Sequence, residues 1–289
     1  MIGIVLAGGN GTRLYPINSY LSKQLIPIYD KPLIYYPLSI LMLSGIKEIL
    51  IVCKNNQKNN YYNLLGDGSK FGIKLTYVIQ NEPKGLPDAF IVCEKYIKNK
   101  RVCMILGDNI FYGSDFVSKQ IIKNFNSKKC TIFAKSVFEP QRYGVIVKDK
   151  KNNIVDVIEK PLSDISNLAI TGLYLFDDNV SELSKKLTPS KRGELEIVDL
   201  IKNYLENDNL NLEILGRGVA WFDSGTFQAY MEASNFVKAI EERHRVKIAC
   251  LEEIALNKEL IDIDHLKSTI QNLASSEYKD YLNNIVKNY

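Results

Sequence analysis

The sequence predicts an α/β protein with a mixed, mostly parallel central sheet that is flanked by helices. Over the first half of the 289 residues, apolar strand-like segments alternate with helical segments. This alternation is typical of a parallel sheet whose two faces are both covered. Beyond residue 130, several strand-like segments follow one another with only short turns between them, which favours an antiparallel addition to the same sheet. The length allows one large domain or two small ones.

The elements of the first half follow from their apolar runs and from the residues that end them. Strands are expected at residues 2–7, 48–53, 74–79 and 102–106. A helix is expected from about residue 32 to 43, closed by Gly45, and another from about 86 to 97. These elements would form the parallel part of the sheet.

The second half begins with strands and ends with helices. Strands are expected at residues 131–137, 144–148, 154–159 and 169–176. Helices are expected at 227–242 and 278–286, with shorter ones near Ile254 and Leu266. No linker rich in Pro, Gly or Ser and no internal repeat divides the chain. We therefore expect a core at 1–226 and a C-terminal helical extension at 227–289 within the same structural unit.

The composition argues against several classes of partner. The 37 Lys and Arg residues nearly balance the 33 Asp and Glu residues, and the formal charge is +4. No basic stripe with interleaved aromatic residues is present, so nucleic acid is not an expected partner. No segment approaches the ~20 consecutive apolar residues that cross a bilayer, and the N-terminus lacks a signal-peptide pattern. Membrane association is therefore not expected.

The five cysteines are widely spaced and include no C-x-x-C pair. Several of them lie within apolar strand-like runs. This pattern predicts buried free thiols in a reducing cytoplasm, and neither a disulfide framework nor a zinc site.

The first strand runs directly into a glycine-rich loop, Gly8-Gly9-Asn10-Gly11-Thr12-Arg13. Glycine lets the backbone turn with positive φ and approach a ligand closely, so that successive N–H groups can line an anion site. Arg13 would add a bidentate cation to the same phosphates. For the glycines alone, an ordinary strand-to-turn junction is the alternative explanation.

This loop belongs to neither of two well-known phosphate loops. Leu14 stands where the dinucleotide fingerprint needs its third glycine, and Gly11-Thr12-Arg13 does not supply the Gly-Lys-Ser/Thr of the ATP/GTP loop. The segment Ser22-Lys23-Gln24-Leu25-Ile26-Pro27 follows it. Lys23 could fold back over the loop and add a second cation to the site.

The glycine loop, the segment around Lys23 and the run Lys31-Pro32-Leu33-Ile34-Tyr35-Tyr36-Pro37 resemble the sugar-1-phosphate nucleotidylyltransferases, and within them the glucose-1-phosphate thymidylyltransferases. The resemblance covers essentially the whole chain. It implies a Rossmann-like sheet whose antiparallel strands form the sugar side of a cleft. It also implies transfer of a thymidylyl group from dTTP to glucose-1-phosphate, giving dTDP-glucose and pyrophosphate, the first step of rhamnose-type dTDP-sugar synthesis.

The resemblance further implies a homotetramer in the cytoplasm and feedback inhibition by a dTDP-sugar. The inhibitor site would use Tyr112, Gly113 and the Glu253-Ile254 segment. The nucleotide site is carried over onto the first strand, the glycine loop and two later motifs. Its residues would be Leu6, Gly8, Gly9, Gly11, Thr12, Arg13, Gln80, Gly85, Leu86 and Asp108.

Two acids are candidates for holding Mg²⁺. Asp108 follows the strand at 102–106, at the edge where open α/β sheets bind ligands, although Gly-Asp-Asn is also ordinary turn chemistry. Mg²⁺ on nucleotide phosphates needs one or two hard oxygen ligands, and Asp223 in Trp221-Phe222-Asp223-Ser224-Gly225-Thr226 offers a second one. In the family, these two motifs hold the metal.

The base would be recognised after the third strand. Gln80 can offer both a donor and an acceptor to a base edge, and Gly85 allows close approach of the backbone. Relatives often have Gly-Leu-Ala-Gln-Ala here, where this chain has Gly85-Leu86-Pro87-Asp88-Ala89. Pro87 and Asp88 suit the first turn of a helix, but the role of the usual glutamine does not carry over.

The sugar phosphate would lie against a second set of residues. Considered alone, Glu159-Lys160 could be a solvated strand end, and Arg192 could belong to the charged first turn of a helix. The resemblance instead places the sugar and its phosphate against Asn109, Tyr143, Gly144, Glu159, Lys160, Gly172 and Arg192.

A sugar phosphate oxygen is already an anion, so catalysis should consist of positioning and charge neutralisation. Arg13 and Lys23 would hold the leaving pyrophosphate, while Lys160 and Arg192 would hold the attacking phosphate. The catalytic candidates are therefore Arg13, Lys23 and Lys160.

Three other functions are alternatives. An oxidoreductase on a similar sheet is disfavoured by Leu14, and a catalytically silent sugar-nucleotide sensor is disfavoured by the presence of both acids and all four cations. A uridylyl- or cytidylyltransferase is the nearest alternative. The preference for dTTP over UTP stays open, because Gln80 meets the same base edge in both.

Overall fold

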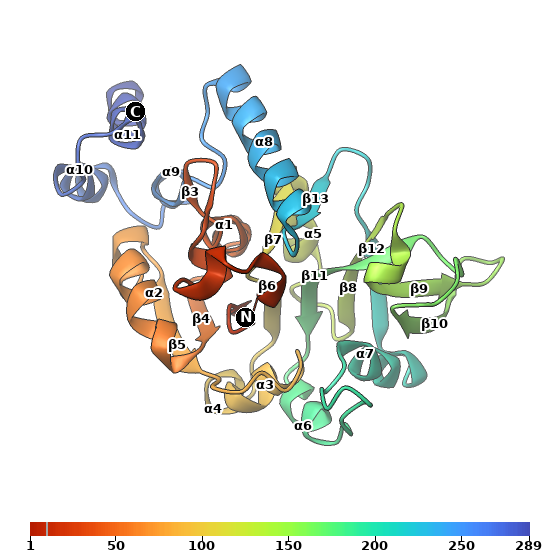
Figure 1. Cartoon of the computed structure of the whole chain (residues 1–289). Coiled ribbons are helices and arrows are strands. Elements are labelled where there is room, and N and C mark those ends of the chain that lie inside the picture. Colours follow the sequence, from red (N-terminus) through yellow and green to blue (C-terminus); the bar gives the residue numbers. More distant parts are fainter. Residues whose placement is uncertain (10) are drawn as a thin grey trace.

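A mixed nine-stranded sheet lies at the centre of the computed structural model, which describes residues 1–9 and 11–289 (Figure 1). Asn10 of the glycine loop lies outside the described residues. The strand order is β10-β9-β11-β6-β1-β4-β5, with β8 pairing with both β11 and β12. The parallel part is made of β1 (Ile2–Leu6), β4 (Glu48–Cys53), β5 (Lys74–Ile79) and β6 (Val102–Leu106).

The antiparallel part continues the same sheet beyond β6. The strand β11 runs antiparallel to β6, β8 and β9, and every residue of β11 is buried. The strands of this part are β8 (Cys130–Ser136), β9 (Gly144–Lys148), β10 (Ile154–Glu159) and β11 (Leu168–Phe176). One further strand, β12 (Leu210–Ile214), lies parallel to β8 at the outer edge. This arrangement confirms the predicted α/β class and the antiparallel addition.

Helices cover both faces of the sheet. They are α1 (Tyr35–Leu43), α2 (Lys58–Leu65), α3 (Asp88–Val92), α4 (Glu94–Ile97), α5 (Ser114–Lys123), α6 (Val180–Lys185), α7 (Ile197–Glu206), α8 (Phe227–His244), α9 (Leu251–Asn257), α10 (Ile263–Gln271) and α11 (Glu277–Asn288). One buried cluster gathers residues of α1 and α9 on one face, and a second gathers residues of α3 and α7 on the other. Because both faces are covered, the strands are apolar without alternation.

Two small sheets flank the central one. One is the hairpin of β2 (Pro27–Ile28) and β3 (Lys31–Pro32), and the other pairs β7 (Asn109–Tyr112) with β13 (Ala220–Asp223). The helix predicted from residue 32 therefore begins only at Tyr35, because Lys31 and Pro32 pair with the preceding strand. The second pairing matters for function, because it brings residue 223 beside residue 109.

The helix predicted at 86–97 is divided into α3 and α4, which meet at Cys93. The N–H of Tyr96 bonds to the Cys93 carbonyl oxygen, three residues back, at 2.8 Å. This spacing tightens the backbone at the junction. The prediction also omitted the helices α2, α5, α6 and α7 and the strands β2, β3, β7, β12 and β13.

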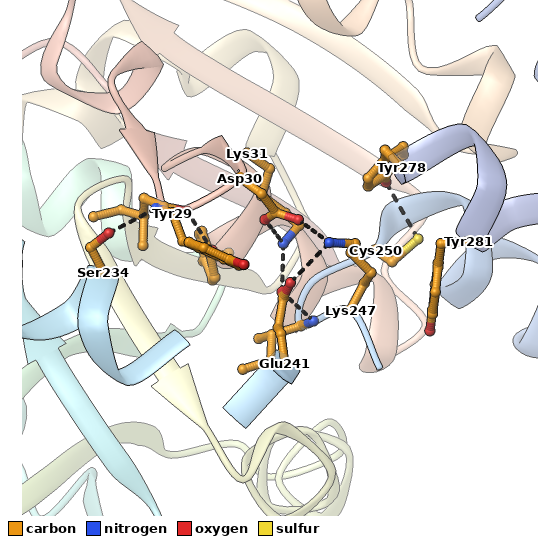
Figure 2. Close-up of polar contacts among 12 residues, drawn as sticks. Tyr29, Asp30, Lys31, Ser234, Glu241, Lys247, Cys250, Tyr278 and Tyr281 are labelled. Carbon is orange, nitrogen blue, oxygen red and sulfur yellow. Dashed lines mark hydrogen bonds and ion pairs between the residues drawn. The ribbon is translucent and has the colours of Figure 1, made fainter. Parts of the chain in front are cut away.

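A buried ion cluster joins the β2–β3 hairpin to the end of α8 (Figure 2). Lys31 Nζ lies 2.7 Å from Glu241 Oε1, and the Lys31 ammonium also pairs with Asp30. Lys247 completes the cluster, with Nζ 2.5 Å from Asp30 Oδ2 and 3.2 Å from Glu241 Oε2. The hairpin comes shortly after Lys23 in the sequence, and α8 begins shortly after Asp223. The cluster therefore links the two segments that carry these two predicted site residues.

All five cysteines are free and buried, as predicted. Among the described residues, no helix is both long enough and apolar enough to cross a bilayer.

Candidate active site

The carboxyl ends of β1 and β6 lie side by side in the sheet and begin the candidate site. Leu6 pairs with Leu106, and the N–H of Gly107 bonds to the Leu6 carbonyl oxygen at 2.9 Å. A Cβ at position 107 would lie 2.7 Å from that oxygen, so only glycine allows this approach of the strands. Beyond this point β1 leads into the glycine loop, while β6 leads to Asp108.

A cavity of about 300 Å³ opens at this edge of the sheet. Residues from both predicted halves line it. The predicted residues among them are Arg13, Gly85, Leu86, Asp108, Asn109, Tyr143, Gly144, Glu159, Lys160, Gly172, Arg192 and Asp223. The structure therefore brings the nucleotide-side and sugar-side candidates into one cavity.

The two candidate metal acids are held together by the pairing of β7 with β13. Asp223 is the register partner of Asn109, so it lies beside the residue that follows Asp108. Ser224 strengthens this link, because its hydroxyl donates to the Asp108 carbonyl oxygen at 2.7 Å. Burial, with a contribution from the nearby Asp108 carboxylate, raises the pKa of Asp223. The pair thus concentrates negative charge in a half-buried position.

Lys23 neutralises one of these acids directly. Its Nζ lies 2.5 Å from Asp108 Oδ2, and the Lys23 side chain is only 5% exposed. Burial of Asp108 opposes its ionisation, but Lys23 and a hydrogen bond from Asn109 Nδ2 hold the pKa of the Asp108 carboxyl below its ordinary value. Lys23 is therefore in reach of any phosphate that approaches Asp108.

A divalent cation fits the chemistry of this pair. The Asp108 carboxylate makes ionisation of Asp223 more costly, and a hard cation bound by both would offset this cost. No group of three or more His, Cys, Asp or Glu side chains with metal-binding geometry occurs in the part of the chain that the structure describes. The remaining ligands of such an ion would therefore come from substrate or water.

The glycine loop turns sharply before Arg13. Gly11 has φ of 59°, in the left-handed region, and the short 3₁₀ turn Thr12–Leu14 follows it. Arg13 is exposed and faces the main cavity. Gly8, Gly9 and Lys23 line a neighbouring cavity of about 200 Å³ on the other side of the loop. Lys23 thus lines the smaller cavity, while its ammonium pairs with Asp108, which lines the larger one.

Not every predicted residue lines these two cavities. Leu6 lies in β1 beneath the loop, and Gly11 and Thr12 lie in its backbone turn. Gln80 is buried behind Gly8, since a Cβ at position 8 would lie 3.2 Å from Gln80 Oε1. These residues support or border the site.

Gly85 joins the predicted base side of the cavity to the predicted sugar side. It forms an isolated parallel bridge with Leu195, and the N–H of Leu195 bonds to the Lys84 carbonyl oxygen at 2.8 Å. Gly85 has φ of 101°, and a Cβ there would lie 2.0 Å from the Leu195 carbonyl oxygen. Any other residue would push the two loops apart.

Asn109 and Gly172 form the floor of the sugar side. Asn109 Oδ1 accepts from Trp221 Nε1 at 2.5 Å and from the N–H of Gly172 at 3.3 Å. A Cβ at position 172 would lie 2.6 Å from Leu106 Cγ and 2.8 Å from Asn109 Oδ1. These contacts hold the Asn109 side-chain amide in one orientation at the edge of the cavity.

Charged side chains form the outer wall of the sugar side. Glu159 pairs with Lys160 at 3.3 Å and with Arg192 at 3.4 Å. Arg192 also pairs with Glu196 at 2.7 Å, and the hydrogen bonds that Arg192 donates to Glu196 raise the pKa of the Arg192 guanidinium. Both cations are about half exposed, so a phosphate can compete for them.

The structure adds residues that the sequence prediction did not assign. Arg142 lines the cavity, and its Nη2 is buried without a hydrogen-bond partner among the described residues, 3.8 Å from Asp223 Oδ2. Its guanidinium also lies over the Tyr143 ring. Trp221 and Glu196 line the cavity as well. In the sequence, the only indication of a role for these three residues was their position within or beside the segments that carry Tyr143, Arg192 and Asp223.

The residues expected to form an inhibitor site lie on separate elements. Tyr112 ends β7 and packs against Phe236 of α8, while Gly113 precedes α5. Glu253 is on α9, where Tyr281 donates to its Oε2 at 2.7 Å. A dTDP-sugar site at these residues stays a prediction.

Comparison with known proteins places this chain among close relatives. The family model described as nucleotidyl transferase matches residues 2–240. A glucose-1-phosphate thymidylyltransferase of Neisseria meningitidis is 46% identical over 287 residues, covering 99% of this chain and 100% of the relative. One from Xanthomonas campestris is 44% identical, with 99% and 97% covered. One from Mycobacterium tuberculosis is 41% identical, with 98% of each chain covered.

Solved structures agree with these relatives. A Bacillus anthracis chain named as a glucose-1-phosphate thymidylyltransferase, in complex with sucrose, superposes with a TM-score of 0.75 at 34% identity. The superposition covers 82% of this chain and 95% of that one. A UDP-glucose pyrophosphorylase complexed with UDP-glucose gives a TM-score of 0.74 at 25% identity, with 83% and 98% covered.

Proposed function

The chain belongs to the nucleotidyl transferase family and, within it, to the glucose-1-phosphate thymidylyltransferases, and from this membership we propose how its residues perform the reaction. The enzyme transfers a thymidylyl group from dTTP to glucose-1-phosphate, giving dTDP-glucose and pyrophosphate. The observation that carries the residue assignment is the single cavity in which Arg13 and Asp108 face Lys160 and Arg192.

The nucleotide is assigned to the side formed by β1, β6 and the glycine loop. The backbone of Gly8 and Gly9 would cradle its phosphates, with Arg13 and Lys23 as cations on either side of the loop. Gln80 and Gly85 would meet the thymine. Leu6, Gly11, Thr12, Leu86 and Asp108 complete the nucleotide site.

The sugar phosphate is assigned to the opposite wall. Lys160 and Arg192 would hold its phosphate, and Glu159 would accept hydrogen bonds from sugar hydroxyls. Asn109, Tyr143, Gly144 and Gly172 shape the sugar pocket. Arg142 joins this proposal, because its buried Nη2 has no hydrogen-bond partner among the described residues and lies 3.8 Å from Asp223 Oδ2.

In the transfer, an oxygen of the sugar phosphate forms a bond to the α-phosphorus of dTTP while the bond from that phosphorus to the pyrophosphate oxygen breaks. The attacking oxygen is an anion, so the site needs no general base. Lys160 and Arg192 align it, and Arg13 and Lys23 stabilise the charge that grows on the leaving pyrophosphate. When bound, a divalent cation, proposed to be Mg²⁺, would be held by Asp108 and Asp223 and would neutralise nucleotide phosphate charge.

The experiment for this function is product analysis with a panel of nucleotides. The protein is incubated with glucose-1-phosphate and dTTP, UTP, CTP, ATP or GTP, and the sugar nucleotides are resolved by mass spectrometry. We expect dTDP-glucose with dTTP. Product from another nucleotide alone would assign the chain to another nucleotidylyl subgroup, and no product with any nucleotide would overturn the proposal.

We also propose that the protein is a cytoplasmic homotetramer that supplies rhamnose-type dTDP-sugar synthesis. A downstream dTDP-sugar would inhibit it at a separate site that uses Tyr112, Gly113 and Glu253-Ile254. In this proposal residues 1–226 form the core, and 227–289 extend it within one unit. The shared buried cluster of α1, α8 and α9 supports the single unit. Light scattering tests the tetramer, and an inhibition pattern that is purely competitive with dTTP would contradict a separate inhibitor site.

A further inference from the structure

We propose that Asp88 is a specificity-determining positioning residue that holds the Gln80 amide in one orientation, so that the site accepts thymine and uracil and rejects cytosine. This inference rests on the proposed assignment of Gln80 to the base. It concerns the position at which this chain departs from the usual Gly-Leu-Ala-Gln-Ala pattern.

The contact between the two side chains is short and specific. Gln80 Nε2 donates to Asp88 Oδ2 at 2.6 Å. Asp88 is the first residue of α3, and Pro87 before it has φ of −61°, a value that the proline ring fixes. The backbone of Gln80 is fixed by a separate hydrogen bond, which its N–H donates to the Cys53 carbonyl oxygen at 2.9 Å. Both partners are therefore anchored independently of any ligand.

The chemistry of the pair fixes which way the amide faces. An ionised carboxylate can only accept hydrogen bonds, whereas a glutamine amide carries an acceptor on one side and donors on the other. Only Nε2 can face Asp88, so Oε1 must face away from it. In the structure Oε1 lies toward Gly8 of the glycine loop and has no hydrogen-bond partner among the described residues. The amide thus has an acceptor and one remaining N–H on the edge that faces away from Asp88, and the proposed assignment places the base against this edge.

That edge distinguishes two kinds of pyrimidine. Thymine and uracil carry an N3–H donor beside a carbonyl acceptor, which match the amide oxygen and the amide N–H of Gln80. Cytosine carries an N3 acceptor beside an amino donor, so the same amide would face it acceptor to acceptor and donor to donor. A glutamine free to rotate by 180° would pair with cytosine equally well. With Asp88 present, that rotation would place Oε1 against a carboxylate and leave a buried acceptor unpaired.

The experiment compares dTTP, dUTP and dCTP as substrates with glucose-1-phosphate in the wild type and in Asp88→Asn. Asparagine can donate as well as accept, so it allows the Gln80 amide to rotate. We expect the ratio of kcat/KM for dUTP over dCTP to fall by roughly tenfold or more in Asp88→Asn. The ratio for dTTP over dUTP should stay unchanged, because these two bases present the same edge. Asp88→Glu, which keeps the carboxylate, should retain discrimination against dCTP.

A merely structural role for Asp88 would lower kcat/KM for all three nucleotides together and leave both ratios unchanged, and that result would overturn the inference. Glu82→Gln serves as a control for the loss of a negative charge, because Glu82 is an exposed residue on the same loop and should alter neither ratio. If Asp88→Asn does not fold, Asp88→Ser provides the same test with a smaller donor and acceptor. A wild type that does not use dTTP would overturn the proposed function instead, so the two failures are distinguishable.

Discussion

Lys23 Nζ lies 2.5 Å from Asp108 Oδ2, although the two residues are 85 positions apart in the sequence. Lys23 is in the 3₁₀ turn before the β2–β3 hairpin, and Asp108 follows β6. A candidate phosphate-binding cation therefore rests on a candidate metal-binding acid. Binding of a nucleotide and its metal would replace this pair with two new ones, lysine with phosphate and aspartate with metal.

Removing either cation of the nucleotide side should reduce turnover more than affinity. For Arg13→Ala and Lys23→Met we expect kcat to fall by at least about 100-fold, because each stabilises charge that develops only as pyrophosphate leaves. The KM for dTTP should change much less. Arg243→Ala, at an exposed position near the end of α8, is the matched control. A near-normal kcat for Arg13→Ala would remove Arg13 from the catalytic assignment.

The buried pair of Lys31 and Glu241 should be important for stability. Both side chains are 2% exposed. Replacing Glu241 by Gln removes a carboxylate that neutralises the buried Lys31 ammonium. We therefore expect the free energy of unfolding to fall by about 3–5 kcal/mol. Urea denaturation measures this change.

The double variant Lys31→Met with Glu241→Met should recover much of that loss, because it removes both buried charges. The exposed pair Lys238–Glu242 on the same helix is the control, and Lys238→Met should change stability by less than about 1 kcal/mol. Equal effects at the buried and exposed pairs would refute this account of the cluster.

Gly85 should be essential for joining the two sides of the cavity. Gly85→Ala places a Cβ within 2.0 Å of the Leu195 carbonyl oxygen at φ of 101°, so the loops must separate. We expect a large fall in kcat/KM for both substrates, measured with each varied in turn. Gly216→Ala is the control, because a Cβ there meets nothing within 4 Å. A fully active Gly85→Ala enzyme would show that the Gly85–Leu195 contact is dispensable.

The thiols should be unreactive in the folded protein. Burial raises the pKa of Cys53 to about 11 and that of Cys93 to about 12, and it raises the pKa of Cys103, Cys130 and Cys250 as well. Since thiolate is the reactive form, a disulfide reagent at pH 8 should label all five only after denaturation.

The same shifts set a pH dependence of stability. A thiol whose pKa is higher in the folded state than in the unfolded state stabilises the folded protein at pH values where the thiol is protonated in both states. This contribution is fully present below the unfolded pKa of about 8.5 and is lost as the pH rises toward the folded values. Unfolding free energies measured at pH 7, 9 and 10 should therefore fall across the series. In the labelling experiment, rapid reaction of the native protein with the disulfide reagent at pH 8 would contradict the assignment of buried thiols.

Much of the sheet could be predicted from the sequence because its strands are continuous apolar runs. The bounds predicted for residues 48–53, 74–79, 102–106, 144–148 and 154–159 agree with β4, β5, β6, β9 and β10. In contrast, the pairing of β7 with β13 joins segments more than 100 residues apart. Such a contact leaves no local periodicity, and it is the contact that sets Asp223 beside the Asp108 turn.

The site was predictable where a motif carries its own chemistry, as in the glycine loop with Arg13. It was not predictable where a side chain acts through a distant partner. The sequence does not show that Arg142 Nη2 lies 3.8 Å from Asp223 Oδ2, buried and without a hydrogen-bond partner among the described residues. Likewise, Asp88 reads in the sequence as a helix-start residue, and only the structure shows its carboxylate on the Gln80 amide.

The most direct measurement of the central claim is pyrophosphate release from dTTP and glucose-1-phosphate, with and without Mg²⁺, in the wild type and in Asp108→Asn. We expect the wild type to release pyrophosphate and this release to stop when the metal is chelated. We also expect a fall of at least about 100-fold in Asp108→Asn, while Asp115→Asn, an exposed acid in the first turn of α5, should keep the wild-type rate. Undiminished release by Asp108→Asn, or release that chelation leaves unchanged, would contradict the assignment of this cavity as a metal-assisted transfer site.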